Sequence, residues 1–274
     1  YFCGVVPSEL QTIKHVNGVK KTQEGLGLPE YIHVYGAEKK TTFAVDVKWD
    51  VKHCAYQKNC KKAQKFVVMG ETDWNKKKLV QGRKDIPLNE YGRHLARETS
   101  YGMRQYQINL AYTSPLRRAK ETAEILLEGR NIPIYEDQRI QEISFGSYEG
   151  MSCIDKTKEE NLAFQKFFQD TGNYIPPEDA ESVQQLYERT GEFLKSLAEN
   201  EKLKDKNLLI STHGAAMTAM LNRMRGSLSV EHFWKNEVPP NCSVTIAELE
   251  GSGFKIIREG IIFYKEEVKH WKAV

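Results

Sequence analysis

From residue 65 onward, short apolar runs alternate with longer segments whose apolar residues recur at helical spacing. This alternation is typical of strands that are joined by helices in a layered α/β domain. It predicts a central, mostly parallel sheet with helices on both faces, closed by two antiparallel strands. The expected strands are 65–69, 108–112, 207–211, 243–247 and 254–257.

Four helices are expected between these strands, and the last of them is a small-residue helix over 215–223. Asn89 is suited to cap the first, which runs over about 90–103. Ser114 and Pro115 predict an N-cap and a first-turn proline for the second, which ends near Gly129. Apolar residues at helical spacing over 183–197 predict the third.

The first 63 residues have a different pattern. Alternating apolar residues over 31–35 and 42–49 predict strands or extended arms, and a polar hinge follows over 53–65. So short a segment is expected to bury little core of its own. The sequence therefore predicts an N-terminal arm, residues 1–63, attached to one large domain, residues 64–274. We expect the arm to lie on its own domain or on other protein subunits.

Composition excludes several classes of protein. A net charge of +3 over 274 residues gives no ground for predicting a nucleic-acid partner, and no stretch approaches the roughly 18 consecutive apolar residues of a membrane span. Five cysteines are too few for a disulfide framework. The spacing of Cys54 and Cys60 matches no common zinc site, which leaves free thiols, a disulfide or a metal site open there. Neither a metal nor a cofactor is expected.

Three features indicate a site for an anion. Turns follow the predicted strands at 69–72 and 212–214, and open α/β sheets bind ligands at the carboxyl ends of their strands. Arg118 lies in the first turn of the helix after Ser114, beside the free amides of a helix start. Glu142 follows as a carboxylate on a predicted loop. Together they predict a phosphate-binding arrangement.

These residues form an ordered series that resembles the histidine phosphatase superfamily, also called the phosphoglycerate mutase-like family. Gly70-Glu-Thr-Asp-Trp-Asn75 resembles the end of its signature Arg-His-Gly-Glu-Thr-x-Trp-Asn. Matches continue, in order and over about residues 65–247, with Ser114-Pro-Leu-Arg-Arg-Ala119, Glu142 with Phe145-Gly146 and Glu149-Gly150, Glu181-Ser182, which resembles the family's helix entry, and Ser211-Thr-His-Gly214. The resemblance implies a three-layer phosphoglycerate mutase-like fold.

The resemblance also implies roles for individual residues. In the family a histidine attacks phosphorus, two arginines and a second histidine hold the phosphoryl oxygens, and a glutamate protonates the leaving oxygen. Arg118 matches the second arginine, Glu142 the acid, His213 the second histidine and Asn75 a phosphate contact. Where the family has Arg-His, however, this chain has Val68-Met69.

Neither replacement has the chemistry of the residue it replaces. A thioether is no basic nucleophile, and valine donates no hydrogen bond to an oxyanion. No residue is therefore expected to act in catalysis, and Arg118, Glu142 and His213 are predicted to be vestiges of the family's site.

The use of these vestigial residues stays open. Arg118 and Glu142 either form an ion pair, or Arg118, His213 and Asn75 keep an anion site. Val68 and Met69 can plug the mouth of the pocket, and His213 can equally be a hydrogen-bonded core residue. The lysines at 76–78 are either a solvated surface or a guide for anionic partners.

The sequence thus predicts a catalytically inactive member of this family that acts as a structural or accessory subunit of a larger complex. A mildly basic chain that begins at Tyr1, as a processed chain would, predicts a mitochondrial location, and otherwise a cytoplasmic one. Two alternatives stay open: a pseudoenzyme that binds phosphate or a phosphoester, and a residual phosphatase with an altered mechanism.

Overall fold

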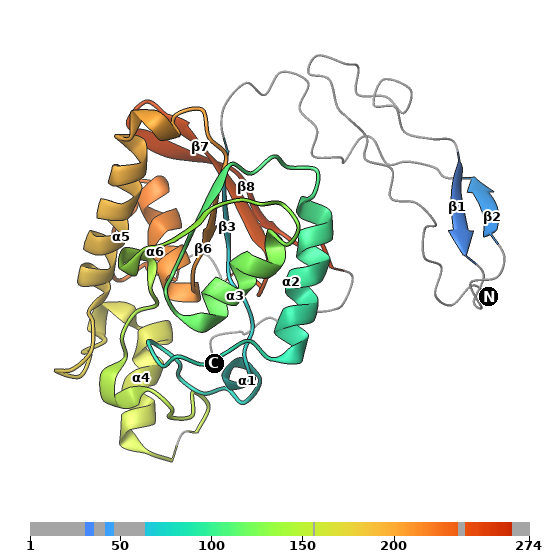
Figure 1. Cartoon of the computed structure of the whole chain (residues 1–274). Helices are drawn as coiled ribbons and strands as arrows, with labels where there is room; N and C mark the ends of the chain where they lie inside the picture. The colour runs from blue at the N-terminus through green and yellow to red at the C-terminus, as the bar shows by residue number, and fades with distance from the viewer. Residues whose placement is uncertain (1–30, 36–41, 47–63, 156, 235–238, 265–274) are drawn as a thin grey trace. The chain divides into compact units, whose positions relative to one another are not determined.

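The computed structural model describes residues 31–35, 42–46, 64–155, 157–234 and 239–264 (Figure 1). The chain forms two units, Tyr1–Lys61 and Lys62–Val274. In the first unit, strands β1 (Tyr31–Tyr35) and β2 (Thr42–Asp46) pair antiparallel. Both strands were predicted from the sequence. Cys54, Cys60 and the rest of the predicted arm lie outside the described residues.

The second unit is built on a six-stranded sheet in the order β5-β4-β6-β3-β7-β8. The strands from β5 to β3 are parallel, whereas β7 and β8 are antiparallel to their neighbours. This arrangement confirms the predicted mostly parallel sheet and its antiparallel closing strands, although the short edge strand β5 was not predicted. The strands are β3 (Gln64–Val68), β4 (Leu110–Thr113), β5 (Ile134–Glu136), β6 (Leu208–Ser211), β7 (Val244–Glu250) and β8 (Gly253–Ile261).

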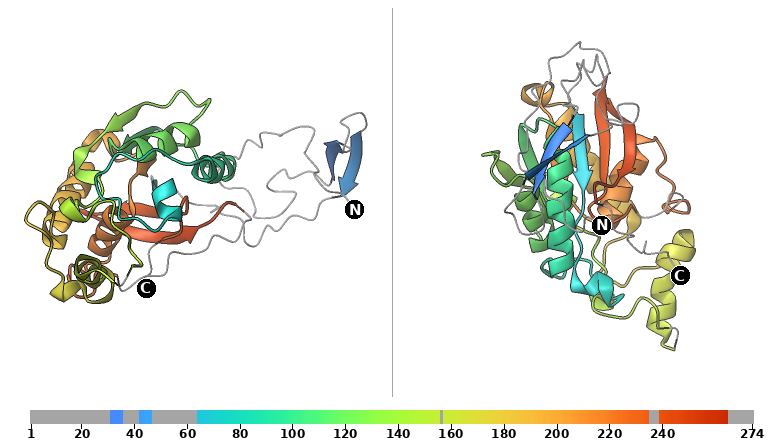
Figure 2. Two further views of the ribbon diagram at one scale, coloured as in Figure 1. Left: turned by 90° about the horizontal axis from the view of Figure 1, so that it is seen from below. Right: turned by 90° about the vertical axis from the view of Figure 1, so that its right-hand side faces the viewer.

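Helices cover both faces of this sheet (Figures 1 and 2). The central strand β6 shows the reason, because all its residues are buried and they alternate between two cores. Leu209 packs in the core that α2 and α3 cover, while Leu208 and Ile210 pack in the core beneath α5 and α6. The predicted three-layer architecture is confirmed. The longer helices are α2 (Glu90–Met103), α3 (Arg117–Leu126), α4 (Glu159–Gln169), α5 (Val183–Ala198) and α6 (Gly214–Met224).

Helix starts follow the local sequence in two of three predicted cases. Asn89 caps α2 by accepting a 2.6 Å hydrogen bond from the Gly92 amide. Ser182 begins α5 with a capping box. Ser114, however, is not the N-cap of α3, which begins at Arg117. The backbone is still extended at Leu116, so Ser114 lies before the helix and its hydroxyl is used elsewhere.

The sequence analysis missed α4 and the short helix α1 (Asp73–Lys76). α4 carries Phe164 and Phe167, which are both about 1% exposed and belong to a ring-rich core. The buried face of α4 does not follow its apolar residues, because Asn161 and Gln165 are buried while Leu162 is 48% exposed, so the sequence lacks a clear apolar stripe there. It forms one side of the site described below.

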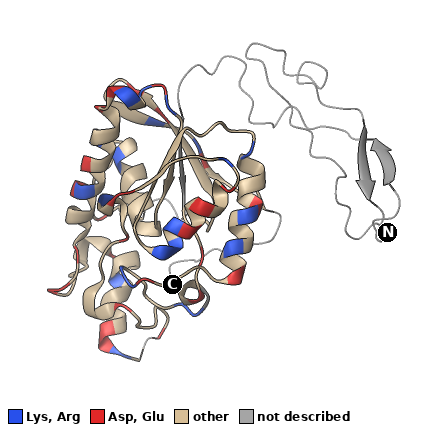
Figure 3. Cartoon of the chain, in the orientation of Figure 1, with Lys and Arg blue, Asp and Glu red and all other residues tan. Residues whose placement is uncertain are grey.

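Basic and acidic residues are interspersed along the helices of this unit (Figure 3). Among the described residues, no helix has the length and apolarity needed to cross a membrane. The same residues contain no group of three or more His, Cys, Asp or Glu side chains arranged to hold a metal ion.

Candidate ligand site

The sheet brings together the two turns at 69–72 and 212–214 that the sequence singled out. β6 lies between β3 and β4, and Ser211 is opposite Val68 on one side and Thr113 on the other. Because all three strands are parallel, the residues that follow them, Met69, Ser114 and Thr212, emerge at the same edge. The motifs therefore meet although about 140 residues separate them along the chain.

A cavity of about 780 Å³ opens at this edge. It brings together five of the six residues that the sequence singled out, and the sixth, Val68, is the last residue of β3. A volume of this size is within the usual range of small-molecule sites, roughly 300–1,000 Å³. The five residues are Met69, Asn75, Arg118, Glu142 and His213.

Arg118 lies at the base of the cavity and is 4% exposed. Its guanidinium donates from Nε to His213 Nδ1 at 3.1 Å, and from its two terminal nitrogens to the carbonyls of Lys84 at 2.8 Å and Gly82 at 2.7 Å. Burial lowers the pKa of Arg118 to about 10, opposed by the nearby charge of Glu142. The side chain is thus a cation at neutral pH, with three of its five N–H groups bonded to protein.

His213 is also held on both sides. Because Arg118 can only donate, Nδ1 of His213 is an acceptor and the proton is assigned to Nε2, which lies 2.7 Å from the Ser114 hydroxyl oxygen. Burial and the charge of Arg118 lower the pKa of the imidazole well below its usual value. His213 is therefore neutral, and both ring nitrogens are occupied. Of the two roles that the sequence left open for His213, this arrangement fits the hydrogen-bonded core residue.

Glu142 caps the start of α6. One carboxylate oxygen accepts from the Ile143 amide at 2.9 Å and from the Ala216 amide at 3.1 Å, and the other accepts from Ala215 at 3.1 Å. Burial raises the pKa of this carboxyl despite these bonds.

Arg118 and Glu142 do not form the contact ion pair that was one of the two sequence alternatives. Each group has closer partners, mainly in the backbone, so the two charges interact only at longer range.

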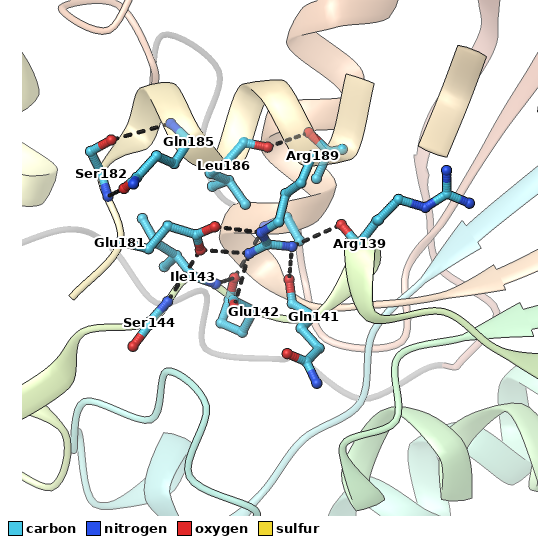
Figure 4. A network of polar contacts seen from close by, with 12 residues as sticks. Arg139, Gln141, Glu142, Ile143, Ser144, Glu181, Ser182, Gln185, Leu186 and Arg189 are labelled. Atoms are coloured by element: carbon cyan, nitrogen blue, oxygen red, sulfur yellow. Dashed lines mark hydrogen bonds and ion pairs between the residues drawn. The ribbon is translucent and has the colours of Figure 1, made fainter. Parts of the chain in front are cut away.

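Arg189 positions the loop that carries Glu142, a role that the sequence analysis missed (Figure 4). Its guanidinium forms a fork with Glu181, at 2.5 and 2.7 Å. It also donates to the carbonyls of Arg139 and Gln141, both at 2.8 Å, and of Glu142 at 3.0 Å. One cation thus fixes three carbonyls of an irregular segment. The sequence did place Arg189 two turns into the predicted third helix, but it did not show that this side chain reaches the Glu142 loop.

The end of β3 contributes an apolar group to the cavity. Met69 is 8% exposed, and its carbonyl accepts a 2.6 Å hydrogen bond from the Cys242 amide. Asn75, the expected phosphate contact, uses its side-chain oxygen to accept from the Thr72 amide at 2.8 Å, within the capping box of α1. Its side-chain oxygen is therefore engaged in a helix cap, while the residue still lines the cavity.

The predicted lysine run divides between solvent and site. Lys77 is exposed, whereas Lys78 lines the cavity and burial lowers the pKa of its ammonium group. Glu71 and Cys153 act in the opposite direction on that pKa. Of these two lysines, only Lys78 can therefore contact a ligand in the cavity.

Aromatic side chains form the opposite wall of the cavity, and the sequence analysis did not predict them. Phe145 packs edge-on against Phe164 and Phe167, with centroids 5.0 and 4.9 Å apart, and Phe168 lies 5.3 Å from Trp234. All five rings line the cavity. The phenylalanine-rich run over 163–168 is the sequence signal that could have indicated this wall.

The fold and this site define a phosphatase-like α/β protein. The model of the histidine phosphatase superfamily (branch 1) matches residues 69–261. The chain therefore belongs to the histidine phosphatase superfamily, as its motifs predicted.

Individual relatives agree with this assignment. The chain is 36% identical over 158 residues to the uncharacterized phosphatase PhoE of Bacillus subtilis, covering 57% of this chain and 74% of that protein. It is 28% identical over 201 residues to phosphoglycerate mutase-like protein 4 of Arabidopsis thaliana, covering 72% and 84%. The solved structure of Bacillus stearothermophilus YhfR matches with a TM-score of 0.68 at 31% identity, covering 73% of this chain and 98% of that one.

Proposed function

We propose that this chain is a catalytically inactive histidine phosphatase-like protein that acts as a structural or accessory subunit of a larger protein complex. The observation that carries the proposal is the pair Val68-Met69 at the end of β3, where the family resemblance places Arg-His. Met69 lines the cavity with a thioether, which has neither a proton to exchange nor a basic lone pair. Covalent phosphoryl transfer needs an activated nucleophile at that point.

The bonds of His213 argue against a substitute nucleophile. One ring nitrogen accepts from Arg118 and the other donates to Ser114, so attack on phosphorus would first require one of two buried hydrogen bonds to break. A residual phosphatase that uses His213 as its nucleophile therefore has less support than an inactive subunit or a ligand-binding pseudoenzyme.

Phosphate release from p-nitrophenyl phosphate tests the loss of catalysis. We expect the natural chain, at high protein concentration, to release no more phosphate than the matched Met69→Leu control. The Val68→Arg/Met69→His double variant restores the family's residues and is expected to gain activity if the rest of the base is intact. Turnover by the natural chain that disappears on His213→Ala would contradict the proposal.

The proposed role as a subunit is supported by the part of the chain that precedes the family match. The match to YhfR uses 98% of that structure but only 73% of this chain, and the family match begins at residue 69. The first unit, Tyr1–Lys61, is therefore additional to the phosphatase-like fold.

Native purification of the tagged full chain from its source tests this role. Stoichiometric partners are expected to co-purify, and cell fractionation checks the predicted mitochondrial location. A lone monomer in the native extract would contradict the subunit role.

A second candidate function is ligand binding without turnover, which is favoured by the cavity of about 780 Å³. The sequence predicted Asn75, Arg118 and His213 as the residues that would hold the anion. Because both ring nitrogens of His213 are already bonded, Lys78 is the further residue of the cavity that would contribute to its phosphate-binding form. Calorimetry with inorganic phosphate and 3-phosphoglycerate tests this form, with Lys77→Met as a control for Lys78→Met. Heat that disappears in Lys78→Met alone would support it, and no heat at millimolar ligand would contradict it.

A further inference from the structure

The cavity offers more aromatic surface than a phosphate group can use. Seven aromatic side chains line it, and they come from α1, α2, α4 and the segments around Phe145 and Trp234. Rings present large apolar faces together with the negative potential of their π-electrons. A ligand that fills this space therefore needs an apolar or aromatic body. Trp74, Tyr91, Phe168 and Trp234 are partly exposed and can contact a ligand directly, whereas Phe145, Phe164 and Phe167 are buried behind them, at 6%, 1% and 1% exposure.

The charge around the cavity is unfavourable for an anion. Its described lining contains four carboxylate residues, Glu71, Asp73, Glu90 and Glu142, but only the two bases Lys78 and Arg118. With the arginine and histidine of the first motif replaced by Val68 and Met69, the former phosphate site carries no surplus of positive charge.

Both bases already have acidic neighbours. Arg118 gives three N–H groups to protein acceptors and interacts with the charge of Glu142. Lys78 interacts with the charge of Glu71. A bound anion would compete with these carboxylates for the same cations.

The remaining two carboxylates lie on the solvent side. Asp73 is exposed in the first turn of α1, and Glu90 is exposed at the start of α2, where it pairs with Arg93 at 2.8 Å. A cation entering between these helices would meet attractive charge before it reached the rings.

We infer that this cavity binds an organic cation with an aromatic or apolar body, such as an arylalkylamine or a quaternary ammonium compound. The rings supply contact area and cation–π attraction, and the carboxylates at the mouth supply charge of the matching sign. The inference goes beyond the proposed function, because it assigns the vestigial site a ligand opposite in charge to a phosphoester.

Three naphthalene probes that differ only in charge test the inference on the full chain: 1-naphthylmethylamine, 1-naphthalenemethanol and 1-naphthyl phosphate. Binding is followed by calorimetry and by quenching of tryptophan fluorescence, since Trp74 and Trp234 line the cavity. The amine is expected to bind at least about fivefold more tightly than the alcohol, and the phosphate most weakly. Adding salt should reduce the advantage of the amine.

The same probes separate this inference from the proposed loss of catalysis. Hydrolysis of 1-naphthyl phosphate releases fluorescent 1-naphthol and would contradict the proposed function alone. Equal binding of all three probes, preference for the phosphate, or no binding at millimolar concentration would overturn the inference alone.

Two variants locate the binding. Asp73→Asn is expected to weaken the amine about threefold and leave the alcohol unchanged, whereas Glu124→Gln, exposed on α3 and away from the cavity, should change neither. Phe168→Ala should weaken both probes, with Phe263→Ala, outside the cavity, as its control. Thermal unfolding confirms that each variant is folded. If Asp73→Asn and Phe168→Ala bind as the natural chain does, the assignment to this cavity is wrong.

Discussion

The polar base of the cavity and its aromatic wall differ in how their side chains contact the rest of the protein: the base through hydrogen bonds, the wall mainly through ring packing. In the base, Ser114, Arg118, Glu142 and His213 are joined to one another or to the backbone. The wall is mostly apolar: the Trp234 indole donates to the Phe167 carbonyl at 2.7 Å, Phe164 and Phe167 are buried, and Phe168 is partly exposed and lines the cavity. The comparison teaches that residues matching a family's catalytic motifs can be bound within the fold, while partly exposed rings leave surface open to a ligand.

The largest effect is expected in the wall. Phe167→Ala removes a ring that is 1% exposed and packs against six neighbouring aromatic residues. The cavity left behind should lower the free energy of unfolding by about 3–5 kcal/mol. Leu162→Ala on the same helix, at a side chain 48% exposed, is the control, with a change within about 0.5 kcal/mol. Urea unfolding measures both, and similar losses would show that the wall is not core.

The next largest loss of stability is expected on removal of Arg189, which holds the loop at the base of the cavity. Arg189→Met leaves the Glu181 carboxylate and three loop carbonyls without their donor. The side chain of Glu181 is only 10% exposed, so we expect a loss of about 3 kcal/mol in urea unfolding. Arg97→Met, at an exposed position of α2, is the matched control. An equally small effect at both arginines would refute the positioning role.

A smaller loss is expected at Ser114. Ser114→Ala leaves the Nε2 proton of His213 without its acceptor and removes the hydroxyl that bonds the Leu116 amide. Loss of buried hydrogen bonds of this kind costs about 1–2 kcal/mol. Ser147→Ala, at an exposed residue, should be neutral. Thermal unfolding compares the two, and a neutral Ser114→Ala would show that the base does not depend on this hydroxyl.

The smallest effect is a pH dependence. The pKa of His213 in the folded state lies well below its unfolded value of about 6.5, so below that pH the unfolded chain binds a proton that the folded chain does not. This contribution to stability is present above pH 6.5 and falls away in acid, by about 1 kcal/mol between pH 7.5 and 5.5.

A matched pair of histidine variants measures this contribution. His213→Gln should flatten the fall between pH 7.5 and 5.5 in urea unfolding, while His232→Gln, at an exposed residue, should keep it. An unchanged profile in His213→Gln would show that this imidazole is not held neutral.

Most of the fold was predictable because the relevant signals are local. Buried strands such as β6 read as short apolar runs, and Asn89 and Ser182 mark helix starts by their own side chains. The start of α3 was misassigned, because the hydroxyl of Ser114 also bonds a histidine 99 residues away. A distant partner of that kind has no local signature.

The sequence predicted which residues form the candidate site, but not which hydrogen bonds they make. Arg118, Glu142 and His213 follow from motif order, and all three line one cavity. Of the two alternatives for Arg118, the ion pair with Glu142 is wrong, because backbone carbonyls and helix amides lie closer to each group than the other charge does. Backbone groups are the same at every position of a sequence, so only coordinates reveal which of them a side chain reaches.

The sequence by itself determined the family, the order of the parallel strands' motifs and the presence of Val68-Met69 before Gly70, because each depends on the identity of residues along the chain. The tertiary structure alone decided that Arg118 binds His213, that Glu142 caps α6, and that rings of α4 line the same cavity as these residues. These contacts join segments that are remote in the sequence, and only the packing of helices on the sheet brings such segments within bonding distance.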